Sequence, residues 1–374
     1  MGNRLSQRRN YNTVANSVVT LNSGGIDIGD EGSHHNIFHN IAAYSNTGVA
    51  INGYAGSDYT RIVDSHLHDN NVGVQIGHSW YWSVENTRIH SNTTSAILID
   101  TARYGTIKNN VLYANGDGIY FAGWAPQNNT IVGNLIYQNE RGLGLYCAAR
   151  YNIVRENLIT QNGSGVYISK NITCPNYNNT FYHNDFLGNS QNALVEEDRY
   201  ANTWDDGYPS GGNYWDDYSG VDLYSGIGQD VPGNDGIGDT TYVIDELNSD
   251  RYPLMRPWNI VQATVDIEPV TLNLKSKGKW VTAYIELLYV YDVADIDMST
   301  VMLDSTIPTE DHPAKIGDYD DDGITDLMVK FDRRELIDYL GGTTGEVTLT
   351  LSGELNDGMP FEGSDIITVI KPGK

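Results

Sequence analysis

The chain has 374 residues, among them 39 glycines and 26 tyrosines, and its 48 acidic side chains against 23 lysines and arginines give a formal net charge of −25. This length predicts two or three domains, and a composition so rich in glycine and tyrosine is typical of turn-rich β structure. The negative charge opposes binding to nucleic acid and to anionic membranes, so neither is an expected partner.

Residues 1–11 form a short N-terminal segment whose first ten residues are polar and basic. This segment lacks the apolar stretch of a secretory signal, so an exported protein would have lost its leader before this sequence begins. No apolar run elsewhere reaches the ~18 residues that a membrane-spanning helix requires. We therefore expect no transmembrane segment.

Residues 12–197 carry a repeat of about 24 residues that is marked by three columns of similar residues. The first column is an asparagine, once a serine, before an apolar pair: Asn16, Asn40, Ser65, Asn86, Asn110, Asn134, Asn157 and Asn184. The second column is Asn22, Asn46, Asn70, Asn92, Asn115, Asn139, Asn162 and Asn189. The third is a glycine that opens an alternating strand, with Ser95 as an interruption: Gly25, Gly48, Gly73, Gly118, Gly142 and Gly165.

Short strands of period two lie between these columns, such as residues 48–51 and 165–168. Stacking of coils at about 4.8 Å gives each short strand two neighbours and a shared interior. Asparagine tolerates left-handed corners and its amides bond along a stack, so the columns are expected to be architectural. We therefore predict an all-β chain in which residues 12–197 form a right-handed parallel β-helix of about eight coils.

Repeat units such as residues 129–136, Asn-Thr-Ile-Val-Gly-Asn-Leu-Ile, resemble those of NosD-like β-helix proteins, which are also grouped as carbohydrate-binding and sugar-hydrolase repeats. The resemblance covers about half of the chain. It implies the β-helix fold. The family includes enzymes, binding proteins and cell-surface proteins, so the resemblance names no single activity.

Irregular loops follow the third strand of each coil, and loops on a rigid scaffold commonly carry binding residues. Stacking would place six of their aromatic rings along one edge, with Arg150 beside them: Tyr59, Trp80, Trp82, Tyr104, Trp124 and Tyr151. Aromatic rings suit the apolar faces of sugars, which favours an acidic polysaccharide or cell-surface glycan as the partner. The alternative is that these rings only cover the edge of the core.

A second aromatic ladder is expected three residues after the first asparagine column, at His68, His90, Tyr113 and Tyr137. Its rings should stack at the coil spacing of about 4.8 Å and face outward. We expect this ladder to stabilise the coils. A general acid or base among its members is the alternative.

A lyase or epimerase that acts on uronates needs a base for the proton beside the carboxylate and a cation for the resulting enolate. The loops supply these residue types, with Arg150 as a second cation, in the candidate catalytic residues His78, Asp100, Arg103 and Tyr104. The Tyr-Gly-Phe-Asp-Pro-His signature of alginate epimerases is absent, because the sequence diverges after Tyr104-Gly105. A glycosidase would use two opposed carboxylates, for which Asp58 and Asp100 are the pair considered.

Cys147 and Cys174 lie in loops of consecutive coils. The coil rise of about 4.8 Å falls within the range of Cα separations that a disulfide spans, so a bridge is sterically allowed. A bridge would imply an oxidising location, in agreement with an extracellular or cell-surface protein.

Residues 198–258 end the repeat and are rich in glycine, aspartate, tryptophan and tyrosine. The stretches 212–218, 234–239 and 250–254 resemble the terminal segment of archaeal NosD-like surface proteins. We expect their aromatic residues to cap the open end of the solenoid. The candidate cation ligands in this segment are Asp235 and Asp239, together with Asp216 and Asp217.

Residues 259–374 alternate in the manner of strands and predict a β-sandwich. Its main motif is Asp318-Tyr-Asp-Asp-Asp-Gly-Ile-Thr-Asp326, which predicts a Ca²⁺ loop with ligands at Asp318, Asp320, Asp322, the Ile324 carbonyl and Asp326. Position twelve of this loop is Val329, so the bidentate glutamate of an EF-hand is missing. The motif therefore resembles the calcium loops of extracellular modules and dockerins.

Two functions follow from these patterns. The first is an extracellular protein that binds or processes a polysaccharide, of lyase or epimerase type if it is catalytic. The alternative is a non-catalytic structural protein of the cell surface or matrix that self-associates through the β-helix and the calcium-stabilised sandwich. A third, copper delivery, is disfavoured because His34-His35 is the one paired histidine feature and methionine is scarce.

Overall fold

The computed structural model describes residues 11–28, 33–54, 56–170, 173–196, 200–287, 291–310, 314–356 and 358–371. The chain divides into two compact units, Met1–Trp258 and Asn259–Lys374. No helix in the described ranges is long and apolar enough to span a membrane.

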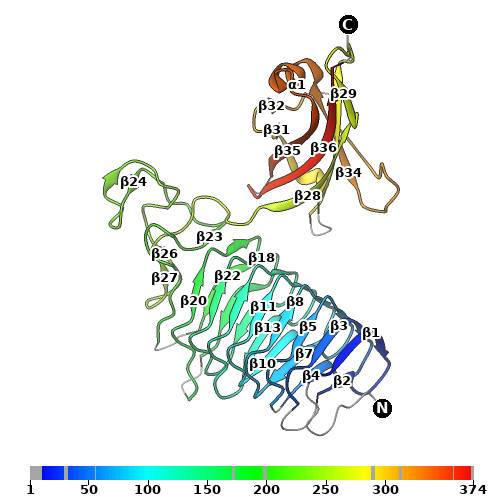
Figure 1. Ribbon diagram of the computed structural model, residues 1–374. Helices are drawn as coiled ribbons and strands as arrows, with labels where there is room; N and C mark the ends of the chain where they lie inside the picture. The colour runs from blue at the N-terminus through cyan, green and yellow to red at the C-terminus, as the bar shows by residue number, and fades with distance from the viewer. Residues whose placement is uncertain are drawn as a thin grey trace. The chain divides into compact units, whose positions relative to one another are not determined.

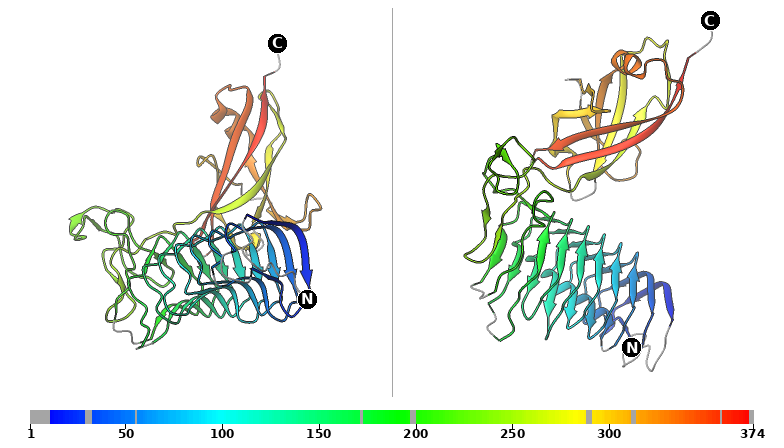
Figure 2. Two further views of the ribbon diagram at one scale, coloured as in Figure 1. Left: turned by 60° about the horizontal axis from the view of Figure 1, so that its bottom comes forward. Right: turned by 60° about the vertical axis from the view of Figure 1, so that its left-hand side comes forward.

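The first unit contains a parallel β-solenoid, which confirms this part of the predicted fold (Figures 1 and 2). One wall is an eight-stranded sheet in which every neighbouring pair is parallel. Its strands, in spatial order, are β2 (Ile26–Asp27), β4 (Val49–Gly53), β7 (Val72–Gly77), β10 (Ser95–Asp100), β13 (Asp117–Ala122), β16 (Arg141–Leu145), β19 (Ser164–Ile168) and β22 (Gln191–Val195).

The rest of the solenoid wall belongs to a 15-stranded sheet that turns a corner within each coil. The long strands β1 (Thr13–Thr20) and β3 (Ile37–Tyr44) run through this corner, and β3 pairs with both strands of the next coil. Before the corner lie β5 (Arg61–Val63), β8 (Ser83–Glu85), β11 (Thr106–Lys108), β14 (Thr130–Val132), β17 (Ile153–Arg155) and β20 (Thr180–Tyr182). After it lie β6 (His66–His68), β9 (Arg88–His90), β12 (Val111–Tyr113), β15 (Leu135–Tyr137), β18 (Leu158–Thr160), β21 (Asp185–Leu187) and β23 (Tyr214–Trp215).

The interior is a set of apolar columns, because the central residue of each three-residue strand points inward. One such column is fully buried along the whole stack: Phe38, Ile62, Val84, Ile107, Ile131, Val154 and Phe181. At its end the ring of Trp204 stacks on Phe181 with centroids 4.3 Å apart, and Trp215 stacks on Phe186 at 4.4 Å. The aromatic residues after the repeat thus continue the interior stack.

Buried asparagine columns join successive coils at their corners. In the column from Asn46 to Asn189, each side-chain Nδ2 donates to the Oδ1 of the next asparagine at 2.9 to 3.2 Å. A second column contains Asn110, Asn134, Asn157, Asn184 and Asn213, and a third contains Asn129, Asn152, Asn179 and Asn202. The amides therefore connect coils in the same direction as the strand hydrogen bonds.

The predicted first asparagine column is wrong by one position in its early coils. Asn16, Asn40 and Asn86 have left-handed backbone with φ of 51°, 52° and 49°, and they lie one position before Ser17, Ile41 and Thr87, which share the register of Ser65 and Asn110. Asn40 Nδ2 nevertheless donates to Asn16 Oδ1 at 2.7 Å, so these two amides also bond between coils. In the register of Asn110, the hydroxyls of Ser65 and Thr87 accept backbone N–H groups from the preceding coil. The sequence pattern merged two adjacent corner positions with different roles.

Four short strands follow in the rest of this unit. They form the antiparallel pairs β24 (Tyr224–Ser225) with β25 (Val231–Pro232) and β26 (Tyr242–Val243) with β27 (Ser249–Asp250).

The second unit contains a nine-stranded sheet that bends around β28 (Val261–Glu268). The first two residues of β28 pair with β36 and the rest pair with β30, which gives a sandwich-like arrangement. The other strands are β29 (Thr271–Asn273), β30 (Trp280–Leu287), β31 (Ile296–Leu303), β32 (Ile307–Pro308), β33 (Lys315–Gly317), β34 (Asp326–Asp332), β35 (Gly345–Leu355) and β36 (Pro360–Ile370). The sequence did not predict the helix α1 (Arg333–Leu340), which Asp332 caps by accepting the N–H groups of Arg334 and Glu335.

Candidate functional site

The six predicted sugar-stacking rings do not share one surface. Tyr59, Trp80, Tyr104 and Tyr151 are about half exposed, and Trp124 is 87% exposed. Trp82 is only 1% exposed and belongs to the core. Gly105 in the next coil leaves the space that the Trp82 ring fills, because a Cβ at Gly105 would lie 2.0 Å from Cε2 of that ring. The prediction that Trp82 contacts a ligand is therefore wrong.

The exposed loop residues form two parallel columns. In one, Tyr11, His35, Tyr59, Tyr81 and Tyr104 stack in sequence with centroid separations of 4.5 to 5.3 Å. In the other, isolated bridges align Trp80, Arg103, Gln127, Arg150 and Tyr177. Arg150 donates from Nε to Gln127 at 3.0 Å and from Nη1 to the Tyr177 hydroxyl at 3.1 Å. The exposed loop residues thus already stack on one another or form hydrogen bonds with one another within the protein.

The four predicted catalytic residues occupy two separate places. His78 and Asp100 lie on consecutive coils where strands of the eight-stranded sheet end, and the His78 N–H donates to the Asp100 carbonyl at 2.9 Å. Arg103 and Tyr104 lie further on, in the loop columns. Within the described part of the chain, no side-chain hydrogen bond links any two of the four.

The predicted second ladder is present. Tyr44, His68, His90, Tyr113 and Tyr137 stack in order, with centroids 4.5 to 5.0 Å apart. Arg88 donates to the Tyr113 hydroxyl at 3.0 Å from Nε, which ties the ladder to a neighbouring column.

A cluster that the sequence did not single out lies on the outer face of the eight-stranded sheet. We call Asp117, Arg141 and Tyr146 the acid–arginine–tyrosine cluster. The Tyr146 hydroxyl donates to both carboxylate oxygens of Asp117, at 3.2 and 3.1 Å. Arg141 Nη1 lies 3.7 Å from Asp117 Oδ1, and Arg141 Nη2 lies 2.9 Å from Glu140. This arrangement brings a cation, a carboxylate and a phenol together from two consecutive coils, because Arg141 opens β16 and Tyr146 directly follows it, whereas Asp117 opens β13.

Two further tyrosines surround this cluster. The Tyr120 ring meets Tyr146 edge-on at 4.4 Å, and the Arg141 guanidinium lies 5.0 Å from the centroid of the Tyr167 ring. Tyr120 and Tyr167 belong to a row of outward side chains that the strand register aligns along the sheet: Asp27, Asn52, Gln75, Leu98, Tyr120 and Tyr167. The row consists mainly of polar and aromatic side chains, with Leu98 as the aliphatic member, and it passes the cluster at Tyr120 and Tyr167.

Burial sets the protonation of the cluster. Asp117 is only 5% exposed, and this burial raises its pKa to about 6, although Arg141 and the Tyr146 hydroxyl act in the opposite direction. Burial, followed by the nearby Asp117 charge, raises the pKa of Tyr146, so its phenol stays protonated at neutral pH. The cluster therefore holds a carboxyl that titrates near neutrality next to a phenolic proton donor.

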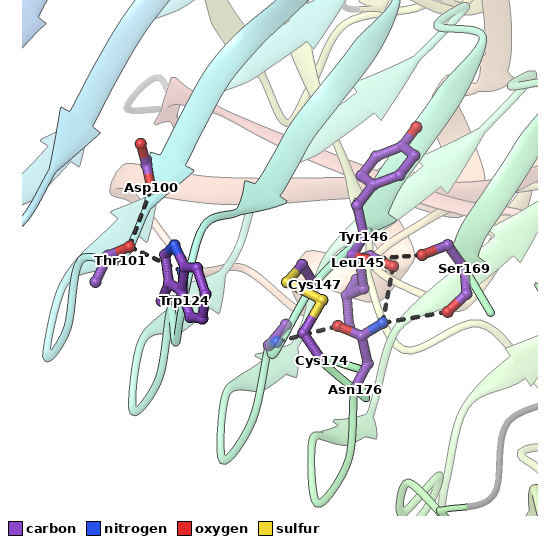
Figure 3. Close-up of a disulfide and its surroundings, with 10 residues drawn as sticks. Asp100, Thr101, Trp124, Leu145, Tyr146, Cys147, Ser169, Cys174 and Asn176 are labelled. Carbon is purple, nitrogen blue, oxygen red and sulfur yellow. Dashed lines mark hydrogen bonds between the residues drawn. A yellow bond between two sulfur atoms is a disulfide. The ribbon is translucent and has the colours of Figure 1, made fainter. Parts of the chain in front are cut away.

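Two local features hold Tyr146 in place. Gly144 has no side chain, and a Cβ there would lie 2.5 Å from the Tyr146 ring and 3.0 Å from Asp117 Oδ1. The next residue, Cys147, forms a disulfide with Cys174 on the following coil, with Cα atoms 5.1 Å apart. Figure 3 shows Tyr146 turned away from this disulfide, while Ser169 donates to the Tyr146 carbonyl at 2.9 Å. The bridge thus anchors the backbone directly after the functional phenol.

Carboxylates in the predicted calcium loop form two overlapping groups. Oxygens of Asp318, Asp320 and Asp322 lie within 4.8 Å of one another, and so do those of Glu286, Asp320 and Asp326. Glu286 comes from β30, where it pairs in register with Asp326 of β34. Burial and the neighbouring aspartates raise the pKa of Glu286. Val329, at position twelve of the loop, is fully buried and offers no carboxylate. Glu286 on the neighbouring strand β30 instead places a glutamate next to Asp320 and Asp326.

Asp235 and Asp239 do not join a comparable group among the described residues. Asp239 accepts the backbone N–H groups of Leu223 and Tyr224 at 2.9 and 3.0 Å. Asp235 accepts the N–H of Ile237 and the side chain of Gln229. These carboxylates stabilise loops.

Comparisons with known proteins agree with the solenoid. The model of a family described as periplasmic copper-binding protein (NosD) matches residues 56–220, which is less than half of the chain. No curated protein matches. The solved structures that resemble the chain include the A-module of Azotobacter vinelandii mannuronan C-5 epimerase AlgE6, at 19% identity and TM-score 0.39, covering 54% of this chain and 59% of that one.

Two further structures are similarly distant. The periplasmic alginate epimerase AlgG is 16% identical with TM-score 0.39, covering 49% of this chain and 48% of that one. An alginate lyase from Paenibacillus sp. str. FPU-7 is 12% identical with TM-score 0.38, covering 55% of this chain and 91% of that one. The chain thus spans only about half to three fifths of the two epimerase structures. At these values the likenesses assign no activity.

Proposed function

We propose that this protein binds a uronate-containing polysaccharide along the outer face of the eight-stranded sheet and transfers a proton at the acid–arginine–tyrosine cluster. The supporting observation is the convergence of Arg141, Tyr146 and the buried Asp117 beside the aligned outward row. An arginine recognises a carboxylate through paired N–H donors, and tyrosine rings cover the apolar faces of sugars. The strand spacing of about 4.8 Å gives such a track a regular repeat.

The reaction class that these groups support is removal of the proton beside the uronate carboxylate. Arg141 holds that carboxylate and stabilises the negative charge that develops on it. The Tyr146 oxygen takes the carbon-bound proton as its own proton passes to Asp117. The electron pair left on carbon then either expels the neighbouring glycosidic oxygen, which takes up the proton held by the Tyr146–Asp117 pair, or takes a proton from water on the other face, after which the pair releases its own proton to solvent. The first outcome is a lyase reaction and the second is an epimerase reaction.

The proposal is tested with a panel of uronate polysaccharides. We expect one member to bind saturably and to give either unsaturated ends, seen by absorbance, or an epimerised product, seen by proton NMR. Arg141→Ala should weaken binding on the order of 10- to 100-fold, because a hydrogen-bonded charge contributes about 1.5 to 3 kcal/mol.

The matched control is Arg155→Ala, which removes an arginine that contacts Glu156 at β17 on the other sheet. It should bind like the unmodified protein. Equal affinity of Arg141→Ala and the unmodified protein would refute the proposed site. A protein inert to the whole panel would instead agree with the alternative of a structural cell-surface protein that self-associates.

An extracellular or cell-surface location is part of this proposal. The Cys147–Cys174 disulfide supports it, because such bridges persist in oxidising compartments. A polysaccharide substrate is also found there.

We further propose that the second unit binds Ca²⁺ at the overlapping carboxylate groups. Asp318, Asp320, Asp322 and Asp326, with Glu286 from β30, offer the hard oxygen ligands that Ca²⁺ prefers. The bound ion would offset the repulsion that raises the pKa of Glu286. Its role is to fix the loop against β30 and β34.

Calcium is expected to raise the thermal midpoint of the second unit relative to EDTA. At 100 times Kd, a ligand that binds only the folded state adds about 2.7 kcal/mol. Asp320→Ala should abolish the shift, because Asp320 belongs to both carboxylate groups. Asp338→Ala on α1 should keep it. The proposal fails if Asp320→Ala and the unmodified protein show the same calcium-dependent shift.

A further inference from the structure

A cavity of about 490 Å³ lies in the second unit, where the loop that joins β29 to β30 meets the first two turns of α1. Six of its lining residues are charged, four of them basic and two acidic: Lys277, Lys279, Arg333, Arg334, Asp332 and Asp338. The whole chain has 48 acidic side chains against 23 lysines and arginines. The cavity therefore reverses the charge balance of the protein.

Hydrogen bonds give the loop that carries Lys277 a defined shape. The Asn273 carbonyl accepts the Ser276 N–H at 2.8 Å, and Ser276 Oγ accepts the Gly278 N–H at 3.3 Å. Gly278 also leaves the space that Arg333 occupies, because a Cβ at Gly278 would lie 2.9 Å from Arg333 Nε. One wall of the cavity is thus formed in advance of any ligand.

Two of the four cations are held in place by contacts within the unit. Arg333 donates from Nε and Nη2 to the Trp280 carbonyl, at 3.0 and 2.6 Å. Its backbone N–H donates to the Lys279 carbonyl at 3.0 Å, which joins the loop to the start of α1. Lys279 Nζ lies 4.0 Å from the centroid of the Trp280 ring, a cation–π contact.

The other two cations, Lys277 and Arg334, are exposed. In the part of the chain that the structure describes, no ion pair joins any of the four cations to a carboxylate. Asp332 Oδ1 instead accepts the N–H groups of Arg334 and Glu335, at 2.7 and 3.2 Å, as the cap of α1. Cations that line a cavity without a carboxylate partner favour an anionic ligand, because their field is not already offset by a neighbour.

The size and the apolar lining of the cavity favour an organic anion. Leu274 and Ile337 are half-buried and also line it. A volume of about 490 Å³ falls within the range of roughly 300 to 1,000 Å³ that small-molecule sites occupy, and a free oxyanion would leave most of it to water. A sugar that carries an oxyanion offers a charged group to the cations and ring carbons to Leu274 and Ile337.

We propose that this cavity binds an acidic sugar, whose oxyanion accepts hydrogen bonds from Lys277 and Arg334. The oxyanion is the carboxylate of a uronate or the phosphate of a sugar ester, because both accept charged N–H donors. The choice of acidic sugars as the ligand class rests on the proposed function. The cavity itself belongs to the second unit and takes no part in the proton transfer, so it is a site of attachment only.

The test is calorimetric titration of the full-length protein that carries Arg141→Ala, which disables the acid–arginine–tyrosine cluster. The ligands are a uronic acid disaccharide, a sugar 6-phosphate, inorganic phosphate and a neutral disaccharide. We expect one molecule of acidic sugar per chain, weaker binding of inorganic phosphate and no binding of the neutral disaccharide. The tighter of the two acidic sugars identifies the oxyanion as carboxylate or phosphate. Because Arg141 is already replaced, the result does not depend on whether the solenoid cluster is active.

In the same background, Lys277→Ala and Arg334→Ala should each weaken binding of the acidic sugar on the order of tenfold, because each removes a charged hydrogen bond. Asp338→Asn should strengthen binding, because it removes a negative charge from the lining. Lys315→Ala is the matched control, since Lys315 is exposed on β33 and does not line the cavity. It should bind the sugar normally.

The thermal midpoint of each variant shows whether the second unit remains folded, and replacement of the exposed Lys277 or Arg334 should leave it unchanged. Failure of both acidic sugars to bind would overturn the proposal. So would normal affinity in Arg334→Ala and Lys277→Ala, because the ligand would then lie elsewhere. Inorganic phosphate that bound as tightly as the sugars would also overturn it, since the cavity would then recognise an ion alone.

Discussion

Replacing Asn134 by alanine is expected to lower the free energy of unfolding of the solenoid unit by about 3 to 5 kcal/mol, because it leaves several buried polar groups without partners. Asn134 Oδ1 accepts both the N–H and the side-chain Nδ2 of Asn110, each at 2.9 Å. Its own Nδ2 donates to Asn157 Oδ1 at 2.9 Å and to the Ile107 carbonyl at 3.0 Å. Water cannot replace these bonds, because the side chains are buried.

Urea or thermal unfolding followed by circular dichroism measures this loss. Asn71→Ala is the control, because Asn71 is exposed and accepts one hydrogen bond, from the Thr94 hydroxyl at 2.7 Å. Its change should stay within about 0.5 kcal/mol, as for most surface substitutions. If the two variants lost equal stability, the buried amide column would not be what couples the coils.

Asp117→Asn is expected to lower turnover of the uronate polysaccharide on the order of 100-fold and to remove a pH inflection near 6. In the unmodified protein the raised pKa of about 6 means that the Asp117 carboxylate is ionised above this pH and protonated below it. Only the ionised form can take the Tyr146 proton. Turnover should therefore rise as pH increases through 6, while the asparagine variant stays low and flat.

Although Asp117→Asn should lower turnover, it should increase the stability of the folded protein. A carboxyl whose folded pKa is raised keeps its proton in the folded state longer than in the unfolded state, so it favours folding at low pH and loses that advantage as pH rises from about 4 to 6. Relative to the unmodified protein, the variant should thus gain stability over this window. Glu140→Gln is the control, because Glu140 also contacts Arg141 but is exposed. It should retain the inflection, and a pH profile of Asp117→Asn that still bends near 6 would assign the titration to another group.

The solenoid was predictable because its signal is periodic. The asparagine column that contains Asn139 and Asn162, and the glycine column that contains Gly142, repeat at nearly constant spacing. Such spacing reflects a stacking arrangement that is the same in every coil. The one-residue error at Asn40 and Asn86 has a local cause. Asparagine suits both the left-handed corner position and the bonding position after it, so residue type alone does not separate them.

The candidate site was harder to predict because its residues are not periodic. Asp117 lies on one coil and Arg141 and Tyr146 lie on the next, and their meeting depends on strand register and on the space left by Gly144. The available signal was that Asp117 and Arg141 each directly precede a glycine of the third column. The prediction for Trp82 was wrong for a related reason. Only the space left by the missing side chain of Gly105, which the Trp82 ring fills, shows that this ring points inward.

Glu286 and α1 were missed for different reasons. Glu286 reaches the predicted calcium loop from β30, an earlier strand in the chain, and only the pairing of β30 with β34 reveals this. The helix α1 is only eight residues long and begins at Arg333, after the N-cap Asp332. In a segment rich in strands, such an aspartate is easily interpreted as part of a turn. Both depend on context that a local pattern does not contain.

The asparagine columns also bear on how such a protein changes length over evolution. Between coils, each amide bonds to the coil before it and to the coil after it, so every interior coil meets the same chemical environment at both faces. Duplicating or deleting one whole repeat would therefore return each remaining asparagine to an equivalent neighbour. The outward row on the eight-stranded sheet would lengthen or shorten by one position per event, which gives selection a simple means of matching the track to longer or shorter chains.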